Sequence, residues 1–181
     1  VLKALSSEIE NLIKPLGMPN AQFDIQLAYS DTFLSNGKDE VNWLFSGNKG
    51  MQFGLLKKTA SGGELSRIML AVKSILAQKS KLPTIIFDEI DTGVSGDVAD
   101  KMGTIMQEMG NYMQIFSITH LPQVASKGNQ HFKVTKFDDD KVTTSTIKLL
   151  NTEERIQEIA QMLSGNTITD AALQHAKQLL N

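Results

Sequence analysis

The sequence predicts an α/β fold in which a mainly parallel sheet is flanked by helices and carries an added antiparallel section. The parallel part is indicated by two apolar β-forming runs, at 84–87 and 113–119, which a helical pattern at 97–109 separates. Alternating apolar and polar residues at 23–29 and 41–45 predict the antiparallel section. With 181 residues, of which 41% are hydrophobic, one domain with a sizeable core is expected.

Composition excludes several kinds of site and of protein. The chain has no cysteine, which rules out disulfides, thiolate metal sites and cysteine nucleophiles. Its formal net charge of -2 gives no global basic footprint for nucleic acid. Because no apolar run approaches the roughly 18 residues that span a bilayer, and no signal-peptide pattern opens the chain, we expect a cytoplasmic protein with no membrane partner.

The first 15 residues have the apolar spacing of a helix. Intervals of three, four and three residues, typical of a coiled-coil seam, separate Leu2, Leu5, Ile9 and Leu12. Pro15 and Gly17 should end this helix. Under two heptads are present, so an ordinary amphipathic helix fits as well as the end of a coiled coil. The chain starts at Val1 within this pattern, which we interpret as a piece of a longer protein: a helix end at 1–15 and a main unit at 16–181.

The next elements are a hairpin and a long helix. Turns at Asn36-Gly37 and at 47–50 bound the two alternating strands. An apolar stripe then predicts a helix that runs from residue 65 to just before Pro83. The start of this helix, Ser61-Gly62-Gly63-Glu64, matches a capping box, S-x-x-E. Two glycines at a helix N-terminus also suit an anion site, because bare amides point at the ligand and phosphate can approach closely.

The strand at 84–87 delivers an acidic pair, Asp88 and Glu89, to the edge of the sheet. The strand is expected to be fully buried. The two acids either cap the following loop or divide two tasks between them. In the second interpretation Asp88 holds Mg²⁺, directly or through water, and Glu89 orients and polarises an attacking water.

A strand, helix and strand in succession predict a right-handed crossover that places His120 at the same sheet edge as the acidic pair. His120 is either structural or a partner for a terminal phosphate or the attacking water. A hairpin then follows at 131–137 and 141–150, turned at Asp138–Asp140. Two helices, at 153–163 and 170–180, complete the chain.

Three strings carry a family resemblance. They are Ala60-Ser61-Gly62-Gly63-Glu64-Leu65-Ser66-Arg67, Phe87-Asp88-Glu89-Ile90-Asp91-Thr92-Gly93 and Thr119-His120-Leu121-Pro122-Gln123-Val124-Ala125. In that order they look like the signature motif, Walker B motif and switch histidine of ABC-type ATPases, and they closely resemble the RecN family of SMC-like bacterial DNA repair proteins. Any single motif is weak evidence, whereas the ordered set is specific.

The resemblance implies a C-terminal half-head, the lobe of an ABC/SMC-type P-loop ATPase head that follows a returning coiled coil. Asp88, Glu89 and His120 would serve ATP and Mg²⁺ on their own head, while Ser61, Gly62, Gly63 and Glu64 would close over the nucleotide of a second protomer. Hydrolysis would then be tied to dimerisation. The family acts with DNA, in recombinational repair of double-strand breaks, which implies a nucleoid-associated protein.

Two departures qualify the family pattern. The phosphate loop G-x-x-x-x-G-K-[ST] is absent, so the nucleotide site would need an N-terminal half-head that carries this Walker A loop, and the isolated chain is expected to be inactive. Ser95 occupies the usual acidic position of the D-loop, for which Asp91 is the other candidate. Besides an ATPase, the residues leave open a non-catalytic, nucleotide-gated interaction module. Glu64 and the loop after Glu89 disfavour a transporter-type subunit.

Overall fold

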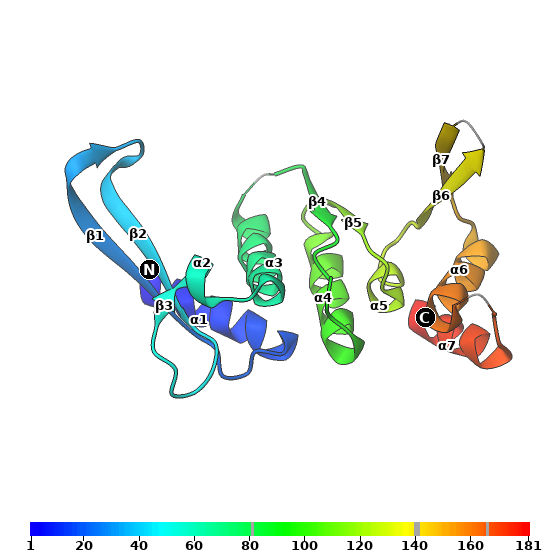
Figure 1. The fold of residues 1–181 in the computed structure, drawn as a ribbon, viewed down its shortest axis with the longest axis horizontal. Coiled ribbons are helices and arrows are strands. Elements are labelled where there is room, and N and C mark those ends of the chain that lie inside the picture. Colours follow the sequence, from blue (N-terminus) through cyan, green and yellow to red (C-terminus); the bar gives the residue numbers. More distant parts are fainter. Residues whose placement is uncertain (81, 140–141, 166) are drawn as a thin grey trace.

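The computed structural model describes residues 1–80, 82–139, 142–165 and 167–181. Its elements follow one another along the long axis of the molecule, from the hairpin β1–β2 at one end to the helices α6 and α7 at the other (Figure 1). One large apolar core joins the helices and sheets of residues 9–124. A second, smaller core lies between α6 and α7.

The chain opens with helix α1, Leu2–Ile13, which the short 3-10 helix η1, Lys14–Leu16, ends as predicted. Gly17 follows with a φ of +80°, a left-handed conformation that glycine adopts without steric cost. The apolar stripe of α1 faces the main core, where Ile9 is fully buried. Continuation of this helix as a coiled coil stays a prediction.

The predicted hairpin forms, with longer strands than the alternation indicates. Strand β1, Gln22–Leu34, pairs antiparallel with β2, Gly37–Ser46, in a register that sets Phe23 opposite Phe45. These two rings are 5.2 Å apart between centroids and anchor the sheet in the core. The short strand β3, Gly54–Leu55, and the helix α2, Leu56–Thr59, follow. Neither was predicted, because such short elements carry no detectable period.

The centre of the molecule confirms the predicted order of strand, helix and parallel strand. Helix α3, Gly62–Lys79, leads to strand β4, Thr84–Asp88, then to helix α4, Gly96–Met109, and strand β5, Gln114–Ile118. Strands β4 and β5 pair in parallel, and α3 packs against α4. In these two helices Ile68, Leu70 and Met102 are 0% exposed, whereas Met69 and Leu76 of the apolar stripe predicted for α3 are 44% and 45% exposed.

The expectation that β4 is buried on both faces is wrong. Phe87 is 6% exposed, whereas Ile86 on the opposite face is 66% exposed. Register pairs Ile86 with Phe116 and Asp88 with Ile118, so the exposed apolar residues share one face. Parallel sheets are usually apolar on both faces, because other elements normally cover each face. In this structure the described residues cover only one face of the β4–β5 sheet.

The last third begins with the short helix α5 (Pro122–Ala125). The strands β6 (Phe132–Asp139) and β7 (Val142–Leu149) follow, and the helices α6 (Thr152–Ser164) and α7 (Asp170–Leu180) come last. The hairpin and both final helices were predicted; Asp140 and Lys141, at its turn, lie outside the described residues. The α/β class is thus confirmed, with parallel pairing in β4–β5 and antiparallel pairing in the other two sheets. Among the described helices, none has the length and apolar character that a membrane crossing requires.

Candidate functional site

The signature segment, Ser61–Glu64, forms a complete capping box at the N-terminus of α3. Ser61 Oγ accepts from the Glu64 amide at 3.4 Å, and Glu64 Oε2 accepts from the Ser61 amide at 2.8 Å. Ser61 Oγ also donates to Glu64 Oε2 at 2.7 Å. Every bond here joins residues three apart, so the local sequence is sufficient to specify this geometry.

Gly62 lies in this segment although packing does not require a glycine there. A Cβ added to Gly62 would meet nothing within 4 Å, and one added to Gly63 would meet only Arg67 Nη1, at 3.5 Å. Glycine is disfavoured by about 1 kcal/mol relative to alanine within a helix. The two glycines therefore leave an open approach to the first amides of α3 at some cost in helix propensity.

The acidic turn, residues 88–91, begins where β4 ends. Asp88 and Glu89 are both exposed, and Glu89 has a φ of +47°, the only positive φ of a described residue other than glycine. The Glu89 amide donates to the Ile118 carbonyl at 3.0 Å, which attaches the turn to β5. Thr92 closes the turn, since its hydroxyl donates to the Glu89 carbonyl at 2.8 Å. This left-handed geometry for a glutamate is unusual and is held by bonds on both sides.

Asp91 is buried, with 1% of its surface exposed. Its Oδ2 accepts a hydrogen bond from the Thr119 hydroxyl, and the Thr119 Oγ1 in turn accepts from the Leu121 amide at 2.9 Å. Asp91 Oδ1 is also buried and has no hydrogen-bond partner among the described residues. Asp91 therefore links the acidic turn to the segment that carries His120.

The structure brings some of the predicted site residues together and leaves others apart. His120 is exposed and follows Thr119, so it lies at the same carboxyl edge of the β4–β5 sheet as Asp88 and Glu89. Within the described part of the chain, no hydrogen bond joins the signature segment to this edge. Ser95 is exposed and caps α4 without a side-chain hydrogen bond, which leaves its hydroxyl available.

The donor set at this edge fits Mg²⁺ only in part. No group of three or more His, Cys, Asp or Glu residues that could hold a metal occurs among the described residues. Mg²⁺ in phosphate chemistry is usually held by one or two carboxylates together with substrate phosphates and water. The exposed Asp88 carboxyl group suits that mode, whereas a metal cage built from this chain alone does not fit.

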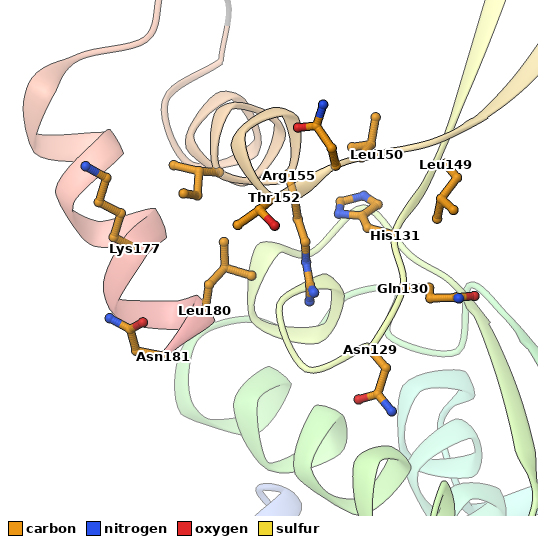
Figure 2. Close-up of a pocket in the computed structure, with 12 residues that line it drawn as sticks. Asn129, Gln130, His131, Leu149, Leu150, Thr152, Arg155, Lys177, Leu180 and Asn181 are labelled. Carbon is orange, nitrogen blue, oxygen red and sulfur yellow. The ribbon is translucent and has the colours of Figure 1, made fainter.

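A cavity lies elsewhere, between the base of hairpin β6–β7 and the helices α6 and α7 (Figure 2). It has a volume of about 520 Å³, and Arg155 and His131 project into it. Burial, followed by the charge of Arg155, lowers the pKa of His131. Arg155 donates to the Ser126 carbonyl at 2.8 Å and also to that of Gly128, so its main contact is with the loop after α5. Sequence patterns gave no signal for this pair.

Sequence comparison finds RecN proteins. No family model matches the chain. The "DNA repair protein RecN" of Rickettsia felis is 44% identical over 179 residues, 99% of this chain and 33% of the relative. The protein of the same name from Deinococcus radiodurans is 41% identical over 169 residues, 93% of this chain and 29% of the relative. The chain thus spans about one third of the length of these relatives, and the predicted resemblance to RecN is confirmed.

Structural comparison finds SMC ATPase heads. The Smc head domain of Pyrococcus yayanosii has a TM-score of 0.68 at 18% identity and covers 90% of this chain and 30% of that one. A structure described under ATP-driven dimerization and DNA stimulated activation of SMC ATPases has a TM-score of 0.60 at 17% identity, covering 92% of this chain and 95% of that one. At such low identity the likeness establishes the fold. The chain is RecN-like in sequence over its whole length and has the fold of an SMC ATPase head lobe.

Proposed function

We propose that this chain is the C-terminal part of an SMC-like ATPase that acts in recombinational repair of DNA double-strand breaks in the cytoplasm, at the nucleoid. The observation that carries the proposal is the carboxyl edge of the β4–β5 sheet, which gathers Asp88, Glu89 and His120. Ligands of open α/β sheets bind at such edges. Similarity to RecN proteins over nearly the full chain supports the repair role.

The three residues at this edge would have separate tasks. Asp88 would hold Mg²⁺, which neutralises charge on the phosphates when bound. Glu89 would accept a proton from the attacking water and orient it. His120 would contact the terminal phosphate or the same water. Exposure of all three side chains leaves each of them accessible to a nucleotide.

The signature segment would act on the nucleotide of a second protomer. Its open glycine amides suit a phosphate. Among the described residues no hydrogen bond joins it to the acidic turn, which favours action in trans over action on its own head. The solved SMC ATPase structure with the same fold was described under ATP-driven dimerization, which supports the involvement of a second protomer.

An N-terminal half-head would complete the site. The chain has no phosphate loop, so this half would supply Walker A. The exposed apolar face of β4–β5, with Ile86, Phe116 and Ile118, is a surface that such a half would cover. We expect the isolated chain to bind ATP weakly or not at all; micromolar affinity in calorimetry would contradict this.

Turnover by the full-length protein tests the proposal. Glu89→Gln should retain ATP binding and reduce phosphate release by about 100- to 10,000-fold, the usual contribution of a positioned base. Glu108→Gln is the matched control, since Glu108 is an exposed glutamate on α4. Unchanged steady-state hydrolysis in Glu89→Gln would rule out Glu89 as the group that accepts a proton from the attacking water. Wild-type protein that binds ATP without turnover would instead indicate the alternative, a nucleotide-gated interaction module.

A further inference from the structure

The acidic turn and the histidine segment are joined by bonds between residues that are far apart in sequence. The Glu89 amide donates to the Ile118 carbonyl, which sets the backbone of the turn against the end of β5. The Thr119 hydroxyl donates to Asp91, 28 residues away along the chain. Two hydrogen bonds therefore join the acidic turn to the end of β5 and the residue after it: one between backbone groups and one between side chains.

The side-chain connection also includes the backbone amide of Leu121, the residue after His120. Thr119 Oγ1 accepts from the Leu121 amide at 2.9 Å while its own hydrogen goes to Asp91. The backbone on both sides of His120 is thereby tied to one hydroxyl group. The same Asp91 uses its carbonyl to accept from the Val94 amide at 3.1 Å, which holds the far end of the acidic turn.

We propose that Asp91 is a positioning residue, which acts through Thr119 to fix the loop carrying His120 relative to the turn carrying Glu89. This inference rests on the proposed function, which gives Glu89 and His120 their tasks. Misplacement of a reacting group by about 1 Å can cost on the order of 100-fold in rate, so a connection that sets their spacing controls turnover.

Burial also separates the roles of the two D-loop candidates. Asp91 is 1% exposed and its Oδ2 is engaged within its own chain, so its side chain does not reach a second protomer. Ser95 is exposed, and its hydroxyl makes no cap bond to α4. Contact across a dimer therefore falls to Ser95, and Asp91 acts inside the head.

Kinetics of the full-length protein test the positioning role. Thr119→Val keeps the shape of the side chain and removes the hydroxyl, and it should reduce kcat by about 10- to 100-fold while KM for ATP stays within about twofold. Thr119→Ser keeps the hydroxyl and should recover most of the lost turnover. The control is Thr104→Val, because the Thr104 hydroxyl donates to the Asp100 carbonyl within α4 and joins no loops.

A double-mutant cycle separates positioning from simple destabilisation. Asp91→Ala combined with Thr119→Val should lower kcat no further than either change alone, because each substitution removes the same hydrogen bond between Thr119 and Asp91. Fully multiplicative losses would overturn the proposal, as would a wild-type kcat in Thr119→Val. If kcat falls only in step with the melting temperature, and equally in Thr104→Val, the role is structural.

Amide hydrogen exchange gives an answer that does not depend on ATP turnover. Thr119→Val should raise exchange of the full-length protein in peptides that cover residues 118–122, because the Leu121 amide loses its acceptor. Asp91→Ala should raise exchange in the same peptides, because the Thr119 hydroxyl is no longer held by the carboxylate. Thr104→Val should leave those peptides unchanged. Unchanged exchange in these peptides in both loop variants would contradict the positioning role of Asp91, even if the full-length protein hydrolyses ATP as proposed. Wild-type protein with no turnover would count against the proposed function alone.

Discussion

The signature segment and the acidic turn hold the proposed functional residues in two different ways. In the signature segment the hydrogen bonds join residues three or four apart, such as Ser61 with Glu64 and Gly62 with Ser66. The acidic turn is held by Ile118 and Thr119, which lie far along the chain. The first site exists wherever the helix forms, whereas the second exists only when β4 and β5 pair. A change in the core should therefore disturb the acidic turn long before it disturbs the signature segment.

After Glu89→Gln, the next largest effect is expected from Asp88→Asn, which keeps the size of the side chain and removes its charge. ATP hydrolysis by the full-length protein should fall by about 100-fold or more, because a bound metal contributes several kcal/mol to a phosphoryl transition state. Steady-state phosphate release as a function of Mg²⁺ concentration measures this. The loss should persist at high Mg²⁺ if Asp88 positions the metal as well as attracting it. Wild-type Mg²⁺ dependence would exclude Asp88 as the ligand.

A pair of glycine substitutions sharpens the comparison. Gly103→Ala should lower the free energy of unfolding by about 1 to 3 kcal/mol, because the new Cβ would lie 3.1 Å from the Gln123 carbonyl oxygen and 3.3 Å from the Val124 Cα. Gly62→Ala should leave stability unchanged or raise it by up to about 1 kcal/mol, since its Cβ meets nothing.

The two variants are to be compared by denaturant unfolding of the chain and by turnover of the full-length protein. Gly62→Ala should reduce turnover without loss of stability, because the methyl group would narrow the approach to the amides of α3. If Gly62→Ala retains full turnover, the open approach has no role in nucleotide binding.

Ser61→Ala tests the local side of the comparison. Removal of the cap should cost about 1 kcal/mol, within the range of about 0.5 to 2 for such substitutions. Denaturant unfolding of the chain measures this loss. Exchange in peptides covering residues 88–91 should not change, because the acidic turn has no bond to the signature segment among the described residues. Raised exchange there would show that the two regions are coupled.

The smallest effect is a pH dependence at the cavity of Figure 2. Burial lowers the pKa of His131, so the folded state binds its proton less readily than the unfolded state does. The stability that this contributes is present above a pH of about 6.5, the ordinary histidine value, and is lost as pH falls below it. Thermal unfolding between pH 8 and pH 5.5 should show a decline that His131→Gln reduces. His175→Gln, at an exposed site on α7, is the control.

Much of the geometry of the candidate site could be predicted from the sequence, because it depends on short local patterns. The capping box, the acidic pair at the end of a strand and the histidine at the end of the next strand are short patterns whose spacing reflects one element or one crossover. Ser95 and Asp91, by contrast, could not be told apart from sequence, because they differ in burial and local spacing does not show burial. The Thr119 hydroxyl gave no signal, since a threonine before a histidine has no periodicity of its own.

The sequence by itself determined the order of elements, the capped start of α3 and the parallel crossover that carries two acids and a histidine to one edge. These follow from local hydrogen bonds, side-chain period and the handedness of chain connections. Only the tertiary structure decided that Asp91 is buried against Thr119 and that the described residues leave one face of β4–β5 exposed. Those facts depend on which surfaces meet in space, and contacts between distant residues leave no trace in local spacing.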